Sequence, residues 1–78
     1  MKNVTIFTTP TCSYCTMVKH FFKENKIDFK EKNVAEDLAA REEMIGMSGQ
    51  LGVPVIEVDK DVVIGFNRPV LKKLLDIK

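Results

Sequence analysis

The spacing of apolar residues changes along the first half of the chain. Residues 3–8 are rich in β-branched and aromatic side chains, which predicts a strand. From Ser13 to Asn25 apolar residues recur at helical spacing and polar residues fill the opposite face, which predicts a helix. The residues on its apolar face are Cys15, Val18, Phe21 and Phe22. A second strand is expected within residues 27–34, centred on residues 29–32.

A second helix is predicted over residues 36–47, and residues 48–52 form a loop after it. The residues that share a broad apolar arc on this helix are Leu38, Met44, Ile45 and Met47. Arg41 also falls within the arc. We expect its stem to pack on the core while its guanidinium group stays in water, and an anion site is the alternative.

The end of the chain predicts a hairpin and a third helix. Val55–Val58 and Asp61–Ile64 have the pattern of two antiparallel strands joined by a tight turn at residues 59–60. Asn67 is suited to cap the helix that follows, with Pro69 in the first turn. The apolar residues of this helix are Val70, Leu71, Leu74 and Leu75.

The predicted order of elements is therefore β-α-β-α-β-β-α. A strand–helix–strand start implies a parallel pair of strands with a right-handed crossover. The closing hairpin adds two antiparallel strands, and helices then cover both faces of the sheet. We expect one α/β domain over residues 1–78, with a four-stranded mixed sheet flanked by three helices. This layout resembles the thioredoxin fold.

Composition and charge narrow the class of protein. The chain has 78 residues, of which 45% are apolar, as in ordinary globular domains. A formal net charge of +1 gives no reason to expect nucleic acid or a membrane surface as the main partner. No signal peptide is visible, no apolar run approaches the ~18 residues of a membrane helix, and only two cysteines are present. We expect a cytoplasmic protein that acts as a monomer.

The two cysteines lie at the predicted junction between the first strand and the first helix, as Cys12-Ser13-Tyr14-Cys15. Residues three apart on a helix lie about 5–6 Å from each other, which is within reach of a disulfide. The free amides and the dipole at a helix N-terminus stabilise a thiolate, which is the attacking species in thiol–disulfide exchange. We therefore predict that Cys12 is the exposed nucleophile and that Cys15 resolves the mixed disulfide.

Three other uses are compatible with a cysteine pair at this spacing. A structural disulfide across so short a loop would add little stability. A zinc site in one chain would have only Cys12, Cys15 and His20, and His20 lies on the opposite face of the helix from Cys15. An iron–sulfur cluster held by the thiolates of two chains stays open as an alternative of another class.

A proline directly before the third predicted strand is the second notable feature. Pro54 cannot donate to a sheet ladder and so marks the start of the strand. A proline by itself most often follows a trans bond. Because a cysteine pair lies upstream, we predict instead that the Val53–Pro54 bond is cis. We also predict that an extended thiol substrate pairs with the backbone of Val53.

With these motifs in order, the chain resembles the glutaredoxins over nearly its whole length. The run T-C-S-Y-C at residues 11–15 is similar to the T-C-P-Y-C of that family. R-E-E-M-I, S-G and V-P-V-I then follow in the order typical of its bacterial members, and Ile64-Gly65 falls at its I-G-G motif. The resemblance implies a glutathione-dependent disulfide oxidoreductase with glutathione as co-substrate and no permanently bound cofactor or metal. Its implied partners are glutathione and disulfide-containing or glutathionylated proteins.

The resemblance also implies roles for particular residues. Cys12 and Cys15 match the nucleophile and the resolving thiol. Tyr14 matches the aromatic residue beside the glutathione sulfur, Val53 the residue whose backbone pairs with the cysteinyl part, and Gln50 a position where arginine often contacts the glycine carboxylate. The full set of implied glutathione- or substrate-binding residues is Thr11, Tyr14, Gln50, Val53, Pro54, Gly65, Asn67 and Arg68, the last two near the γ-glutamyl end.

Two departures from the family pattern bear on the reductant. Thr9 stands where many glutaredoxins have a lysine, and Phe66 replaces a glycine. The segment from Gly65 to Pro69 is similar to the G-F-R-P of redoxins that serve ribonucleotide reductase and are reduced by thioredoxin reductase. Tyr14 is typical of the glutathione-dependent members, so we expect glutathione to be the reductant, with the redoxin as the alternative.

Overall fold

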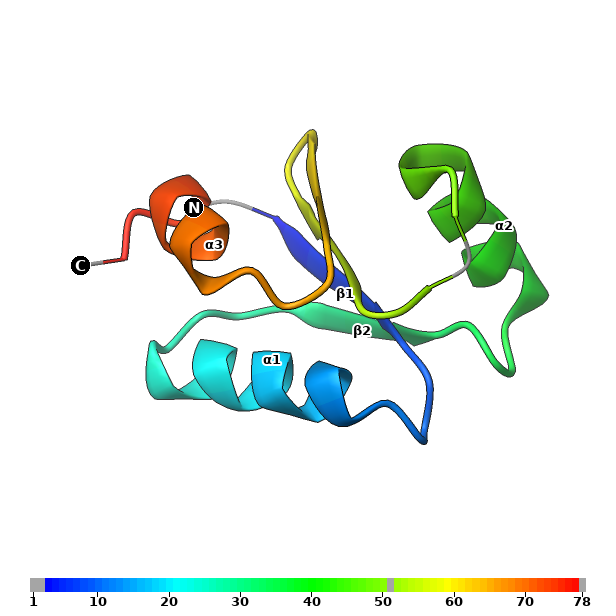
Figure 1. Ribbon diagram of the computed structural model, residues 1–78, viewed down its shortest axis with the longest axis horizontal. Helices are drawn as coiled ribbons and strands as arrows, with labels where there is room; N and C mark the ends of the chain where they lie inside the picture. Colours follow the sequence, from blue (N-terminus) through cyan, green and yellow to red (C-terminus); the bar gives the residue numbers. More distant parts are fainter. Residues whose placement is uncertain (1–2, 51, 78) are drawn as a thin grey trace.

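The chain folds into one mixed sheet with helices on both of its faces. The computed structural model describes residues 3–50 and 52–77. The elements are β1 (Val4–Thr8), α1 (Ser13–Glu24), β2 (Lys30–Asn33), α2 (Leu38–Ser48), β3 (Val55–Val58), β4 (Asp61–Ile64) and α3 (Arg68–Leu74). The predicted order of elements is confirmed (Figure 1). Leu51, which falls in the predicted loop after α2, lies outside the described residues.

The sheet has the strand order β2-β1-β3-β4. β1 and β2 are parallel and β3 and β4 are antiparallel, as the sequence predicts. The structure adds that β3 also runs antiparallel to β1. β1 and β3 are the two central strands and run antiparallel, so the end of β1 lies beside the start of β3 in the middle of the sheet. The register pairs Phe7 with Val55 at this end of the two strands.

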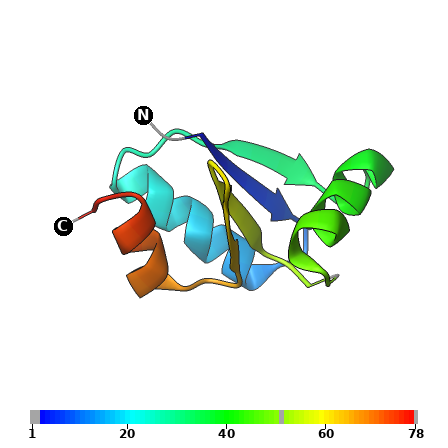
Figure 2. The same ribbon diagram turned by 90° about the horizontal axis from the view of Figure 1, so that it is seen from above.

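Alternate residues of β1 face different helices (Figure 2). Val4 and Ile6 belong to a cluster with residues of α1 and α3, whereas Phe7 belongs to a cluster with Ala40 and Met44 of α2. The period of two along the strand thus divides the core into two layers. None of the helices in the described ranges is long and apolar enough to cross a membrane.

The apolar face predicted for α1 is the buried face in the structure. Its members are Cys15, Val18, Phe21 and Phe22. The arc predicted for α2 is partly wrong, because Leu38 is 66% exposed and Ile45 is also exposed. The buried residues of α2 are Ala40 and Met44, four positions apart. When only one edge of a helix packs on a sheet, its buried residues form a single row with this spacing. Leu38 and Ile45 fall outside that row and therefore stay exposed.

Capping side chains decide where two of the helices begin. Asp37 accepts a hydrogen bond from the Ala40 N–H (3.1 Å), so α2 begins at Leu38, two residues later than predicted. Gly49 ends α2 in the left-handed region, at φ 72°. Asn67 caps α3 by accepting from the Val70 N–H (3.3 Å), as the sequence predicts.

Candidate active site

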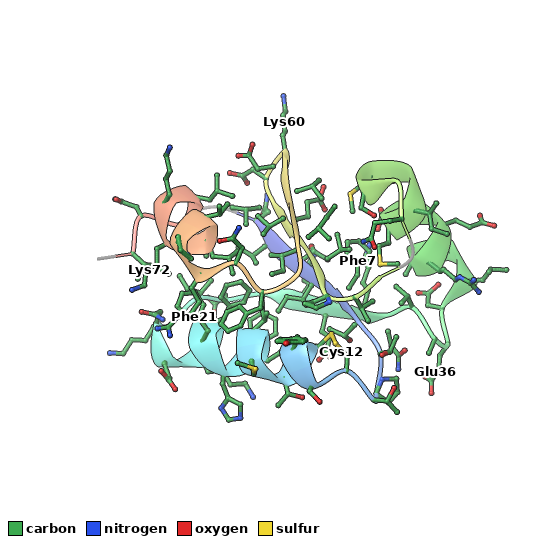
Figure 3. The ribbon with its side chains drawn as sticks, in the orientation of Figure 1. Phe7, Cys12, Phe21, Glu36, Lys60 and Lys72 are labelled. Carbon is green, nitrogen blue, oxygen red and sulfur yellow. A yellow bond between two sulfur atoms is a disulfide. The ribbon has the colours of Figure 1, made fainter. Side chains whose placement is uncertain are left out.

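Cys12 and Cys15 form a disulfide at the beginning of α1 (Figure 3). Their Cα atoms are 5.2 Å apart, the separation expected for two residues on one helical turn. Thr8 ends β1, and the Cys12 N–H donates to the Thr9 carbonyl (3.3 Å), which closes the turn between strand and helix. The strand-to-helix turn therefore places the sulfur pair at the carboxyl end of β1, a central strand of the sheet.

The two sulfurs have different surroundings. Cys12 is the N-cap of α1, and its sulfur accepts a hydrogen bond from the Cys15 N–H (3.1 Å). No acidic residue occupies the first turn of α1, so no carboxylate there opposes negative charge on Cys12. Cys12 is partly exposed, whereas Cys15 is 1% exposed. An accessible sulfur with a backbone donor is suited to attack, and a buried partner is suited to resolve the product from within.

The predicted residues Val53, Pro54 and Gly65 lie where β3 begins and β4 ends. The Val53–Pro54 bond is cis, as predicted. The Gly65 N–H donates to the Pro54 carbonyl (2.8 Å), which joins two of the predicted site residues that are far apart in sequence. Gly65 has φ 78°, a conformation that side chains with a Cβ rarely adopt. Pairing of a substrate with the Val53 backbone stays a prediction.

The other predicted binding residues are mostly at the surface. Thr11 is exposed and Tyr14 is 61% exposed, within the first turn beside the disulfide. Asn67 is exposed, and its carboxamide oxygen is occupied in capping α3. The Arg68 guanidinium lies over the Phe21 ring of α1, 5.5 Å from the ring centroid, which is a cation–π contact.

Gln50 has partners within its own loop. Its side-chain oxygen accepts from the Gly52 N–H (2.7 Å), and its side-chain nitrogen donates to the Gly52 carbonyl (3.0 Å). Both ends of the amide are thus bound to the backbone that precedes Val53. The side-chain nitrogen has two N–H groups and uses one of them here, so the second remains to donate to a glycine carboxylate, as the family resemblance implies.

Arg41 of α2 lies beside the turn that carries the cysteines, a neighbour that the sequence did not reveal. Its side chain is exposed and lines a hollow of about 220 Å³ together with Thr9, which lies on the turn that carries the cysteines. The floor includes Val34 and Met44, both buried. Arg41 precedes Met44 by three residues and so lies on the same side of the helix. This spacing is the signal in the sequence that could have placed Arg41 next to the buried Met44. A cation therefore lies beside Thr9, the position where the family resemblance implies a lysine.

Beneath the turn, a polar network ties three elements together. Thr8 is 2% exposed, and its hydroxyl donates to the Glu31 carboxylate on β2 (2.8 Å). Lys19 of α1 donates to the same carboxylate oxygen (3.0 Å). These two hydrogen bonds, from Lys19 first and then from Thr8, hold the pKa of Glu31 below its ordinary value. Thr8 follows Val4 and Ile6 at a spacing of two and so lies on the same buried face of β1. This spacing is the signal in the sequence that could have marked Thr8 as buried.

His20 and the acidic residues do not gather into a metal site. Among residues 3–50 and 52–77, no group of three or more His, Cys, Asp or Glu side chains is placed to hold a metal ion. His20 is exposed on the outer side of α1.

The glutaredoxin family profile matches residues 4–63 of this chain. A glutaredoxin-like 8.6 kDa protein from the rubredoxin operon of Clostridium pasteurianum is 44% identical, over 94% of this chain and 97% of its own. Glutaredoxin 3 of Escherichia coli is 41% identical, over 76% of this chain and 71% of its own. The glutaredoxin-like protein NrdH of Lactococcus lactis is 37% identical, over 91% of this chain and 97% of its own.

The fold agrees with these likenesses. The crystal structure of a T8A mutant of the thioredoxin-like protein BC3987 superposes with a TM-score of 0.92, at 33% identity and over the full length of both chains. The expected thioredoxin fold is thereby confirmed. The match of family, fold and cysteine position leads to one conclusion: this chain belongs to the glutaredoxin family and is a thiol–disulfide oxidoreductase with Cys12 and Cys15 as its redox pair.

Proposed function

We propose that this protein reduces protein disulfides and glutathione mixed disulfides in the cytoplasm, and that glutathione returns the electrons. The observation that carries the proposal is the asymmetry of the redox pair. A partly exposed Cys12 sulfur accepts a backbone N–H at a helix N-terminus, and its partner Cys15 is buried. This arrangement favours attack by Cys12 and release by Cys15.

The exchange proceeds in two displacements. In the reduced protein the Cys12 thiolate attacks one sulfur of the substrate disulfide, a new S–S bond forms, and the substrate bond breaks to release a thiolate that takes up a proton. The Cys15 thiol then loses its proton and attacks Cys12, which forms the internal disulfide and releases the second substrate thiol. Two electrons pass to the substrate, and two glutathione molecules restore the dithiol while becoming glutathione disulfide.

Charge around the cysteine turn supports glutathione as the reductant. Glutathione is a tripeptide with a carboxylate at each end and its thiol in the middle. Arg41 beside Thr9 offers a cation on the α2 side of the turn, and Arg68 offers one near the start of α3. Tyr14 adds an exposed aromatic ring next to the sulfurs. Cations on two sides of a central disulfide suit a ligand with two anionic ends.

A redoxin that thioredoxin reductase reduces is the second candidate. The run from Gly65 to Pro69 supports it, as does the likeness to a glutaredoxin-like protein NrdH. Phe66 packs against Phe21, with ring centroids 5.8 Å apart, so it fills space that a glycine would leave open. A family member of this kind would use the same Cys12 chemistry with another electron donor.

The test offers the oxidised protein two reducing systems, each with NADPH and with bis(2-hydroxyethyl) disulfide as the substrate. One contains glutathione and glutathione reductase, and the other contains thioredoxin reductase. The proposal predicts fast NADPH oxidation in the first and slow oxidation in the second. Fast turnover with thioredoxin reductase alone would reject glutathione and support the redoxin.

A further inference from the structure

A second hollow lies where α1 meets the chain at the start of α3. It encloses about 240 Å³ and is lined by Met17, His20, Phe21, Glu24, Phe66 and Arg68. Four of these side chains belong to α1, Phe66 lies on the segment that joins β4 to α3, and Arg68 is the first residue of α3. Phe21 is nearly buried, and Figure 3 shows it between α1 and that segment. The hollow therefore has an aromatic floor and an open mouth.

An apolar ridge connects the hollow to the disulfide. Tyr14 and Met17 lie three residues apart on α1 and are 61% and 48% exposed. Residues at this spacing share a helix face, so together they extend from the first turn of α1 toward Phe21. Met17 follows Cys12 by five positions, about 7.5 Å along the helix axis. The exposed apolar surface is thus continuous with the reactive sulfur.

The charges around the hollow are unevenly placed. Arg68 stacks over Phe21 on the α3 side, and neither of the two ion pairs between described residues includes it. Glu24 carries the negative charge on the lining, and it lies at the last residue of α1, farthest from the disulfide. A carboxylate that enters from the side of Cys12 therefore approaches a cation held over an aromatic ring.

We propose that this hollow docks the polypeptide that flanks the reactive cysteine of a protein substrate. An aliphatic or aromatic side chain packs between Met17 and Phe66, and a neighbouring carboxylate pairs with Arg68. This inference rests on the proposed function and names a substrate class for it.

Chain length separates this substrate from glutathione. The middle of the hollow lies about eight residues beyond Cys12 along α1, or roughly 12 Å. An extended peptide advances about 3.3 Å per residue, so the docked side chain belongs to the third or fourth residue from the reactive cysteine. Glutathione has one residue on each side of its cysteine, so its γ-glutamyl carboxylate can share Arg68 at the edge of the hollow, but glutathione has no apolar side chain to place between Met17 and Phe66.

The experiment uses ten-residue peptides whose single cysteine is joined to glutathione. One carries Leu-Asp at the third and fourth positions after the cysteine, a second carries the pair at the same positions before it, and a third carries Gly-Lys at both places. We expect the wild-type protein to reduce one of the Leu-Asp peptides about fivefold faster, in kcat/KM, than the Gly-Lys peptide.

Met17→Glu removes the apolar ridge without altering the core, because Met17 is 48% exposed. It is expected to abolish the preference for the Leu-Asp peptide and to leave turnover of bis(2-hydroxyethyl) disulfide unchanged, and Met17→Leu is expected to keep the preference. The matched control is Leu38→Glu, because Leu38 is 66% exposed on α2. This variant should change neither the preference for the Leu-Asp peptide nor the turnover of bis(2-hydroxyethyl) disulfide.

Each contrary outcome has a definite meaning. Equal rates for all three peptides, or an equal loss on both substrates in Met17→Glu, would overturn the docking site while leaving the redox function intact. A wild-type dimer in light scattering that Met17→Glu dissociates would also overturn it, since the hollow would then be covered by a second copy. Failure of the wild-type protein on bis(2-hydroxyethyl) disulfide with either reductant would instead reject the proposed function.

Discussion

Arg41→Met tests the role of the cation beside the cysteine turn. Arg41 is exposed, but the hollow that it lines has buried Val34 and Met44 in its floor, so a carboxylate bound there would lose part of its hydration. An exposed ion pair contributes about 0.2–1 kcal/mol, and a hydrogen bond to a charged group about 1.5–3 kcal/mol. We take about 1 kcal/mol for this intermediate setting, which corresponds to about a fivefold rise in the KM for glutathione.

The assay is turnover of bis(2-hydroxyethyl) disulfide with glutathione reductase and NADPH at varied glutathione concentrations. We expect kcat to stay near the wild-type value, because Arg41 lies on α2 and not at the sulfurs. The fivefold difference should shrink as salt is raised, since the Debye length falls from about 10 Å at 0.1 M to about 3 Å at 1 M. The control is Lys60→Met, which removes a charge from the tip of the β3–β4 hairpin, far from Cys12 (Figure 3). An unchanged KM in Arg41→Met, or the same change in Lys60→Met, would refute the reasoning.

Three further predictions follow from the same geometry. Cys12→Ser should abolish turnover, while Cys15→Ser should keep partial activity on a glutathione mixed disulfide, because attack and resolution use different sulfurs; equal losses would contradict this division. In reduced Cys15→Ser, absorbance at 240 nm should show Cys12 ionising below the ~8.5 of a free cysteine, since the residue 15 N–H donates to its sulfur, and a midpoint pKa at or above that value would count against the helix N-terminus as the cause. Thr8→Val should lower the free energy of unfolding by about 1 kcal/mol in urea denaturation, and Thr8→Ser by less because it keeps the hydroxyl. Because the pKa of Glu31 is lowered in the folded protein, the Thr8 contribution should be present above the ordinary carboxyl value of 4.5 and be lost as the pH falls through the lowered folded pKa. A difference that persists unchanged in acid would argue against the Thr8–Glu31 bond.

The features that the sequence predicted well are those set by neighbouring residues. The helix that begins after Cys12, the hairpin of β3 and β4, and the Asn67 cap each depend on a few consecutive positions. Local spacing also placed the two cysteines within disulfide reach, because one helical turn separates them.

The features that the sequence missed depend on how distant elements pack. Thr8 and Glu31 are 23 residues apart, and their bond exists because β1 and β2 pair in parallel. Arg41 reaches the cysteine turn only because α2 lies against the end of β1. On α2, apolar character alone marked Leu38 as core, but the way in which the helix approaches the sheet leaves that residue in water. Pattern reasoning identifies which residues are apolar and does not fix which edge of a helix the sheet will contact.

The central claim is that Cys12 attacks a disulfide and holds the departing group as a mixed disulfide. The most direct test exposes reduced Cys15→Ser protein to glutathione disulfide and measures the intact mass, followed by peptide mapping. The account predicts one glutathione per chain, attached to Cys12 and removed by excess glutathione. A chain that stays unmodified, while the same treatment modifies a free cysteine peptide, would contradict the claim.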